Sequence, residues 1–128
     1  MIVFDVEADN LLEGATKIHC LSYTTDGSDY TTLFDYDEMR ELVLSQRGLI
    51  GHNIIRYDIP LLEKILDIKI TARLFDTLPM SWVLNYSRAR HDLDSFGQDF
   101  GIPKPQITDW SSLPQEEYAH RCTEDVKI

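Results

Sequence analysis

The sequence predicts an α/β domain in which a mixed five-stranded sheet is flanked by helices. Three observations support this prediction. The chain opens with Met1–Val6, a run rich in β-branched residues without glycine or proline, which is typical of a buried strand. Two further strand-like runs follow over short connections, as in an antiparallel meander. Beyond them, helical and strand-like segments alternate, which predicts parallel pairing across helical crossovers.

Short apolar or β-branched runs between turn residues predict five strands, with Asp26 and Gly27 as a clear turn signal. The strands are Met1–Val6, Lys17–Thr24, Tyr30–Phe34, Gly48–Gly51 and Ile68–Phe75. Apolar residues at helical spacing, together with capping residues, predict five helices. The helices are Tyr36–Gln46, Tyr57–Leu66, one capped at Asp76 and Thr77 that ends near Tyr86, Leu93–Phe100, and Pro114–Ile128. A stiff linker is expected at Ile102–Pro105, and a loop over residues 108–114.

The length of 128 residues predicts one domain that covers residues 1–128. No apolar run reaches membrane-spanning length, and no basic segment followed by an apolar one opens the chain. Cys20 and Cys122 lie far apart in sequence and outside any CxxC pair. We therefore expect a soluble, cytoplasmic protein with reduced cysteines and no membrane partner.

The formal net charge of −10 argues against a nucleic-acid partner, unless bound metal ions account for part of the acidic residues. Asp5 and Glu7 stand two residues apart on a strand and therefore project from the same face. Two buried carboxylates on one face are costly without a cation, and Mg²⁺ prefers carboxylate oxygens. Asp58 at the start of a helix and Asp125 on the last helix could complete a cage for two divalent ions roughly 4 Å apart.

These residues carry a resemblance to the DnaQ-like, or DEDD, family of 3′–5′ exonucleases. More narrowly, the sequence resembles the N-terminal exonuclease domain of phage family A DNA polymerases. The first family motif, Asp-x-Glu, matches Asp5 and Glu7, and the second, Asn-x-x-x-(Phe/Tyr)-Asp, matches Asn53 to Asp58. Two intervening landmarks match Phe75-Asp76-Thr77 and His91-x-Leu93-x-x-Phe96-Gly97. The resemblance implies an RNase H-like fold over nearly the whole chain.

The third motif decides the general base. The family has a Tyr-x-x-x-Asp kind and a His-x-x-x-x-Asp kind, and by spacing His120 and Asp125 match the histidine kind. Phage polymerases usually carry the tyrosine kind, and here Arg121 occupies the tyrosine position. Two interpretations follow. Either His120 is the base, reaching across the crevice, or the tyrosine position is lost to Arg121 and activity is impaired.

The resemblance implies a two-metal mechanism with Mg²⁺ or Mn²⁺. Asp5 would bind both ions, Glu7 and Asp125 would complete the first site, and Asp58 would support the second through water. His120 would take the proton of the attacking water, and the product would be a nucleoside 5′-monophosphate. Leu11 would be either an apolar wedge beside the terminal base or ordinary core, and Asn53 either a substrate-binding residue or a helix cap.

The implied partners are 3′ ends of single-stranded DNA or RNA and, in phage replication or proofreading, a DNA polymerase in cis or in trans. A phage-encoded protein would then act in the host cytoplasm. The alternative is a catalytically impaired exonuclease-fold module that binds nucleic acid or serves as a scaffold. Only three residues follow Asp125, so we expect a minimal enzyme, a split polymerase subunit or a fragment of a longer protein.

Overall fold

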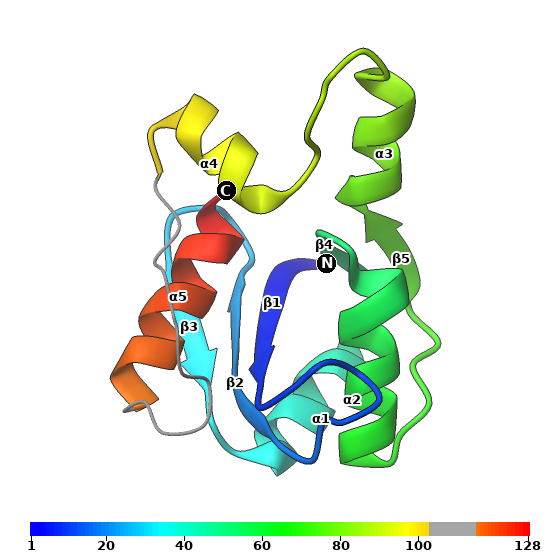
Figure 1. Cartoon of the computed structure of the whole chain (residues 1–128). Coiled ribbons are helices and arrows are strands. Elements are labelled where there is room, and N and C mark those ends of the chain that lie inside the picture. Colours follow the sequence, from blue (N-terminus) through cyan, green and yellow to red (C-terminus); the bar gives the residue numbers. More distant parts are fainter. Residues whose placement is uncertain (103–114) are drawn as a thin grey trace.

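The computed structural model describes residues 1–102 and 115–128 (Figure 1). Its strands are β1 (Ile2–Ala8), β2 (Ile18–Thr24), β3 (Tyr30–Leu33), β4 (Gly48–Gly51) and β5 (Arg73–Asp76). Its helices are α1 (Tyr36–Ser45), the short π-helix η1 (Ile54–Asp58), α2 (Ile59–Leu66), α3 (Thr77–Leu84), α4 (Leu93–Phe100) and α5 (Gln115–Lys127). The sheet order is β3-β2-β1-β4-β5, which confirms the predicted mixed sheet.

β1 lies at the centre of the sheet, where the pairing changes from antiparallel to parallel. It pairs antiparallel with β2 along its whole length, from Val3 opposite Thr24 to Ala8 opposite Ile18. It pairs parallel with β4 only at Ile2 and Val3. The second half of β1 therefore has its β4 side open, and ligands of α/β proteins commonly bind where a sheet changes direction in this way.

The end of β4 passes very close to β1. A Cβ atom on Gly51 would lie 2.9 Å from the carbonyl oxygen of Phe4 and would also collide with the Ile54 side chain. Only glycine fits at this crossing. The close approach allows the chain to turn directly from β4 into η1 beside the open half of β1.

Helices cover the sheet and build its core. α5 packs across β2, β1 and β3 (Figure 1). Leu61, Leu62 and Leu66 of α2 are buried in the same cluster as Ile2 and Phe4 of β1. Full burial of each such side chain contributes about 1.5–3 kcal/mol. α1 is capped by Asp35, whose side chain accepts hydrogen bonds from the backbone N–H groups of Asp37 and Glu38.

Two elements differ from the predicted ones by more than two residues at one end. The helix expected from Tyr57 begins earlier as η1, because the Ile59 N–H bonds the Ile54 carbonyl five residues back. The strand expected over Ile68–Phe75 is shorter, since its one neighbour, β4, offers only four residues for pairing. The expected linker at Ile102–Pro105 and the loop over 108–114 fall, apart from Ile102, outside the described residues.

Within residues 1–102 and 115–128, the helices are too short or too polar to cross a lipid bilayer.

Candidate active site

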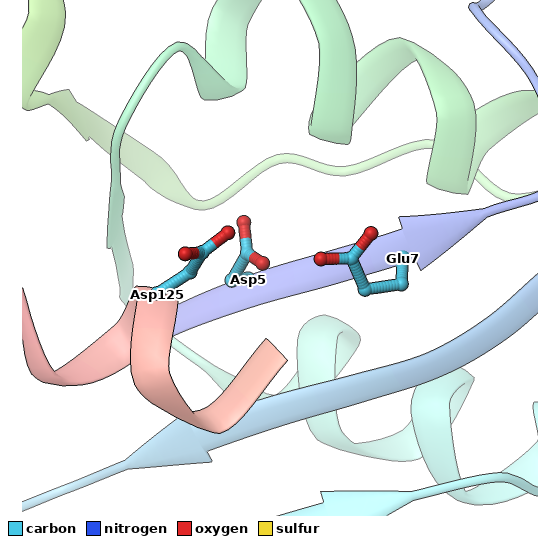
Figure 2. Close-up of side chains that lie close together, drawn as sticks. All are labelled: Asp5, Glu7 and Asp125. Atoms are coloured by element: carbon cyan, nitrogen blue, oxygen red, sulfur yellow. The ribbon is translucent and has the colours of Figure 1, made fainter. Parts of the chain in front are cut away.

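Three carboxylates meet beside the open half of β1. Asp5 and Glu7 project from the same face of the strand, and Asp125 reaches toward them from α5 (Figure 2). Each of the three offers one oxygen such that all these atoms lie within 4.8 Å of one another. Glu7 and Asp125 are each 7% exposed. Helix α5 is held at this place by Cys122, whose thiol donates a hydrogen bond to the Asp5 carbonyl oxygen at 3.0 Å.

Asp58 enters the same place from η1. It lines, together with Asp5, Glu7 and Asp125, one hollow of about 490 Å³. The preceding turn depends on Asn53, which adopts the left-handed conformation (φ 62°) that asparagine tolerates. The Asp76 carboxylate holds this turn by accepting hydrogen bonds from the backbone N–H groups of Asn53 (2.8 Å) and Ile55 (3.0 Å). It also caps α3 through the Leu78 N–H, as predicted.

The electrostatics of the site favour a bound cation. Burial raises the pKa of Asp58 well above its ordinary value, and the charges of Glu7, Asp76 and Asp125 raise it further, while a hydrogen bond from the Val6 backbone lowers it. The Oδ2 atom of Asp58 is buried and has no hydrogen-bond partner among the described residues. A buried acceptor among like charges is destabilising unless a cation or a proton neutralises it.

The same charges act on Tyr57. Burial, followed by Asp58, Glu7 and Asp5, raises its pKa to about 12. Its hydroxyl group therefore stays protonated at neutral pH and donates a hydrogen bond to the Asn10 carbonyl oxygen at 2.8 Å. Tyr57 thereby ties the β1–β2 loop to the turn that carries Asp58.

His120 and Arg121 do not lie where the predicted histidine motif requires them. The exposed His120 side chain lines a separate hollow with Phe34 and Lys127. The reason is helical geometry, since five residues rotate a side chain about 140° away from Asp125, whereas four residues leave it about 40° away. Arg121 accordingly faces the acidic hollow, and its Nε atom lies 3.2 Å from the Glu7 carboxylate. The structure thus corrects the expected reach of His120 across the crevice.

The two predicted substrate-binding residues border the site. Leu11 is 77% exposed, which excludes the alternative that it belongs to the core. It lines a second hollow of about 550 Å³, whose wall also includes Glu7, Asn53 and Arg121. Within the described residues, the Asn53 side chain makes no capping hydrogen bond to η1, so its predicted role as a cap is wrong.

Sequence reasoning assigned no role in the site to the wall opposite the carboxylates, although His91 and Leu93 belong to a family landmark. Leu78 and Trp82 of α3, and His91 and Leu93 after it, line the first hollow. His91, matched above only as part of a family landmark, is held against α3, because its Nδ1 atom lies 2.7 Å from the hydroxyl oxygen of the buried Ser81. Trp82 stands four residues after Leu78, so the two share one helix face, and this spacing was the available signal.

Comparison with known proteins gives one pair of sequence relatives. No protein-family model matches the chain. The chain is 31% identical to the DNA-directed DNA polymerase of Escherichia phage T7 over an alignment of 99 residues. This alignment covers 66% of the chain and 14% of the polymerase, and the polymerase of Enterobacteria phage T3 matches to the same extent. The chain therefore spans only a small part of the length of these relatives.

Solved structures share the fold over nearly the whole chain. Brucella melitensis NrnC bound to pGG is 15% identical with a TM-score of 0.74, and NrnC with bound Mg²⁺ is 14% identical with a TM-score of 0.71. Each match covers 98% of this chain and 66% of NrnC. The family B DNA polymerase of Pyrobaculum calidifontis is 15% identical with a TM-score of 0.67, covering 98% of this chain and 23% of the polymerase.

Proposed function

We propose that this chain, a DnaQ-like exonuclease domain with the RNase H-like fold of that family, hydrolyses nucleic acid from the 3′ end with divalent metal ions. One observation carries the proposal. Four carboxylates from three separate elements, β1, η1 and α5, line one hollow at the centre of the sheet. Such convergence of buried acids is unfavourable for stability and is typical of a site built for metal-assisted chemistry.

The residues fit Mg²⁺ or Mn²⁺. All four groups offer hard oxygen ligands, as these ions require. Asp58 adds a buried oxygen with no hydrogen-bond partner among the described residues. NrnC, which shares the fold, has been solved with bound Mg²⁺. We propose that Asp5, Glu7 and Asp125 hold one ion and that Asp5 and Asp58 hold a second.

A pair of such ions, when bound, lowers the pKa of an attacking water and stabilises the leaving 3′-oxygen. The protein supplies position and exclusion of solvent. Asp5 and Glu7 stand on a central strand that is paired along its length with β2, so their spacing is fixed. Asn53 and the exposed Leu11 would contact the nucleotide that is removed, Leu11 as an apolar wedge beside its base.

Motif spacing is the only support for His120 as a general base of the histidine kind. In the described conformation the imidazole lies on the other side of α5, so this role would require α5 to turn. If α5 does not turn, the proton of the attacking water has no protein acceptor in the position that a tyrosine or histidine motif would provide. We expect slow hydrolysis if α5 stays as described.

A second candidate function follows from Arg121. Its ion pair with Glu7 partly neutralises the cluster and competes with a metal ion for the same carboxylate. The alternative is therefore a catalytically impaired module that binds nucleic acid. In either case the similarity to phage DNA polymerases supports a DNA polymerase as partner, in cis or in trans. We propose that the domain acts in replication or proofreading in the cytoplasm, that of the host if it is phage-encoded.

Digestion of single-stranded oligonucleotides tests the function. A 5′-labelled oligonucleotide should yield a ladder that shortens with time in Mg²⁺ or Mn²⁺, and a 3′-labelled one should release a labelled mononucleotide first. Glu7→Gln and Asp5→Asn should abolish both, whereas Glu41→Gln, an exposed acid on α1 outside the hollow, should not. Binding of the oligonucleotide without any product would favour the impaired module, and neither binding nor hydrolysis would reject both.

A further inference from the structure

The wall of the hollow that faces the carboxylates carries an exposed aromatic ring. Trp82 of α3 lines the hollow and is 42% exposed. The guanidinium group of Arg56, in η1, lies 5.8 Å from the centre of the Trp82 ring. Arg56 is two residues from Asp58, so one short element places a carboxylate inside the hollow and a cation at its rim.

Exposure alone does not single out Trp82. Val83 and Leu84, the next residues of α3, are each 76% exposed. Neither of them lines the hollow, whereas Trp82 and Leu78 do. The wall also contains His91, fixed through its Nδ1 atom by Ser81. Asp92 lines the hollow too, but its carboxylate is engaged by Arg90 (3.0 Å) and by the Ser95 N–H (2.8 Å).

Two adjoining hollows border the carboxylates. The first hollow, with Trp82 on its wall, and the second, with Leu11, share the residues Val6, Glu7, Asn53, Tyr57 and Arg121. They therefore adjoin as one trough, with Trp82 and all four carboxylates in the first part, Leu11 in the second, and Glu7 common to both. Volumes of about 490 and 550 Å³ are each sufficient for a small organic ligand.

An exposed aromatic ring beside an arginine is the combination that binds single-stranded nucleic acid without sequence preference. Bases stack on the ring, and the guanidinium group contacts phosphate or stacks as a cation. In a chain with a net charge of −10, binding energy from stacking is needed, because the overall field repels a polyanion.

We propose that Trp82 is the stacking platform for the base on the 5′ side of the nucleotide that is removed, and that Arg56 supports the ring and contacts the adjoining phosphate. This proposal rests on the proposed function, since it assumes that a 3′ end lies at the carboxylates. Trp82 is here a substrate-binding residue, and the contact is independent of base identity.

The test uses the full chain with 5′-fluorescein-labelled (dT)₆. Trp82→Ala should raise KM for this oligonucleotide about fivefold to 100-fold with a much smaller change in kcat, and Trp82→Phe should restore most of the loss. The matched control is Val83→Ala, which truncates the neighbouring exposed side chain outside the hollow. Thymidine 5′-p-nitrophenyl phosphate, which has no second base, should show a far smaller change in KM with Trp82→Ala.

A binding measurement separates this proposal from the proposed function. Fluorescence anisotropy of the same oligonucleotide in Ca²⁺ should show weaker binding by Trp82→Ala, by a similar factor, whether or not the wild type hydrolyses it. Weaker binding without hydrolysis by any variant would reject the exonuclease and keep the stacking site. Hydrolysis with the same KM and affinity for wild type, Trp82→Ala and Val83→Ala would overturn the stacking site alone. A loss that Trp82→Phe does not restore would also overturn it.

Discussion

Replacing Asp58 by asparagine should stabilise the metal-free protein at neutral pH. Asp58 is buried among Glu7, Asp76 and Asp125, and its pKa is raised well above the ordinary value of 3.8. Asparagine has nearly the same shape, its amide oxygen can still accept the hydrogen bond from Val6, and its NH₂ group can donate to a neighbouring carboxylate. The substitution therefore removes one of four like charges and leaves the packing unchanged.

The sign and size follow from linkage between protonation and folding. Between pH 3.8 and the higher native pKa, the native state binds more protons than the unfolded state, so the free energy of unfolding falls as pH rises. At a pH above both the native and the unfolded pKa, each unit of difference between the two lowers the free energy of unfolding by about 1.4 kcal/mol. We therefore expect Asp58→Asn to raise the free energy of unfolding at pH 8 and to raise Tm by several degrees, because it also removes a buried oxygen that has no hydrogen-bond partner among the described residues, which costs about 1–3 kcal/mol.

The assay is thermal unfolding in EDTA and in Mg²⁺, at pH 5 and pH 8. In EDTA the gain should be larger at pH 8 than at pH 5. In Mg²⁺ at about 100 times Kd, binding should stabilise the wild type by about 2.7 kcal/mol and the variant by less. Asp29→Asn, in the exposed β2–β3 turn, is the control and should not change Tm with either pH or metal. A lower Tm of Asp58→Asn in EDTA at pH 8 would refute the reasoning.

Three further substitutions test the site. Arg121→Tyr releases Glu7 from its ion pair, so the Mg²⁺ concentration for half-maximal hydrolysis should fall about tenfold, equivalent to 1.4 kcal/mol; an unchanged Mg²⁺ titration would contradict this. His120→Ala should keep kcat within about threefold, because the imidazole faces away from the carboxylates. A general base would cost about 100-fold or more, and such a loss would mean that α5 turns during catalysis. Asp76→Ala leaves the N–H groups of Asn53, Ile55 and Leu78 without their acceptor and should lower the free energy of unfolding in urea by about 2 kcal/mol or more; a loss under 0.5 kcal/mol would show that Asp76 does not hold the turn.

Much of the fold could be predicted because its signals are local. The opening strand is continuous and apolar, the turn at Asp26 and Gly27 is strong, and the order of segments specifies parallel crossovers after a meander. The four carboxylates could also be predicted, since Asp5 and Glu7 share a strand face and motif spacing identifies Asp58 and Asp125. The length of β5 could not be predicted, because it depends on how many residues β4 offers for pairing.

Local sequence patterns are sufficient to predict the central strand, the type of sheet and the set of acids. These features depend on the spacing of apolar residues and on the side-chain types within each short segment. The packing of α5 on the sheet determines which neighbour of Asp125 enters the site. Spacing favoured His120, whereas the regular turn of α5 against β1 and β2 directs Arg121 inward and His120 outward. It also determines that Trp82 and His91 complete the hollow, because α3 and the segment after it line the same hollow as β1 although they are far from it in sequence, which no local pattern encodes.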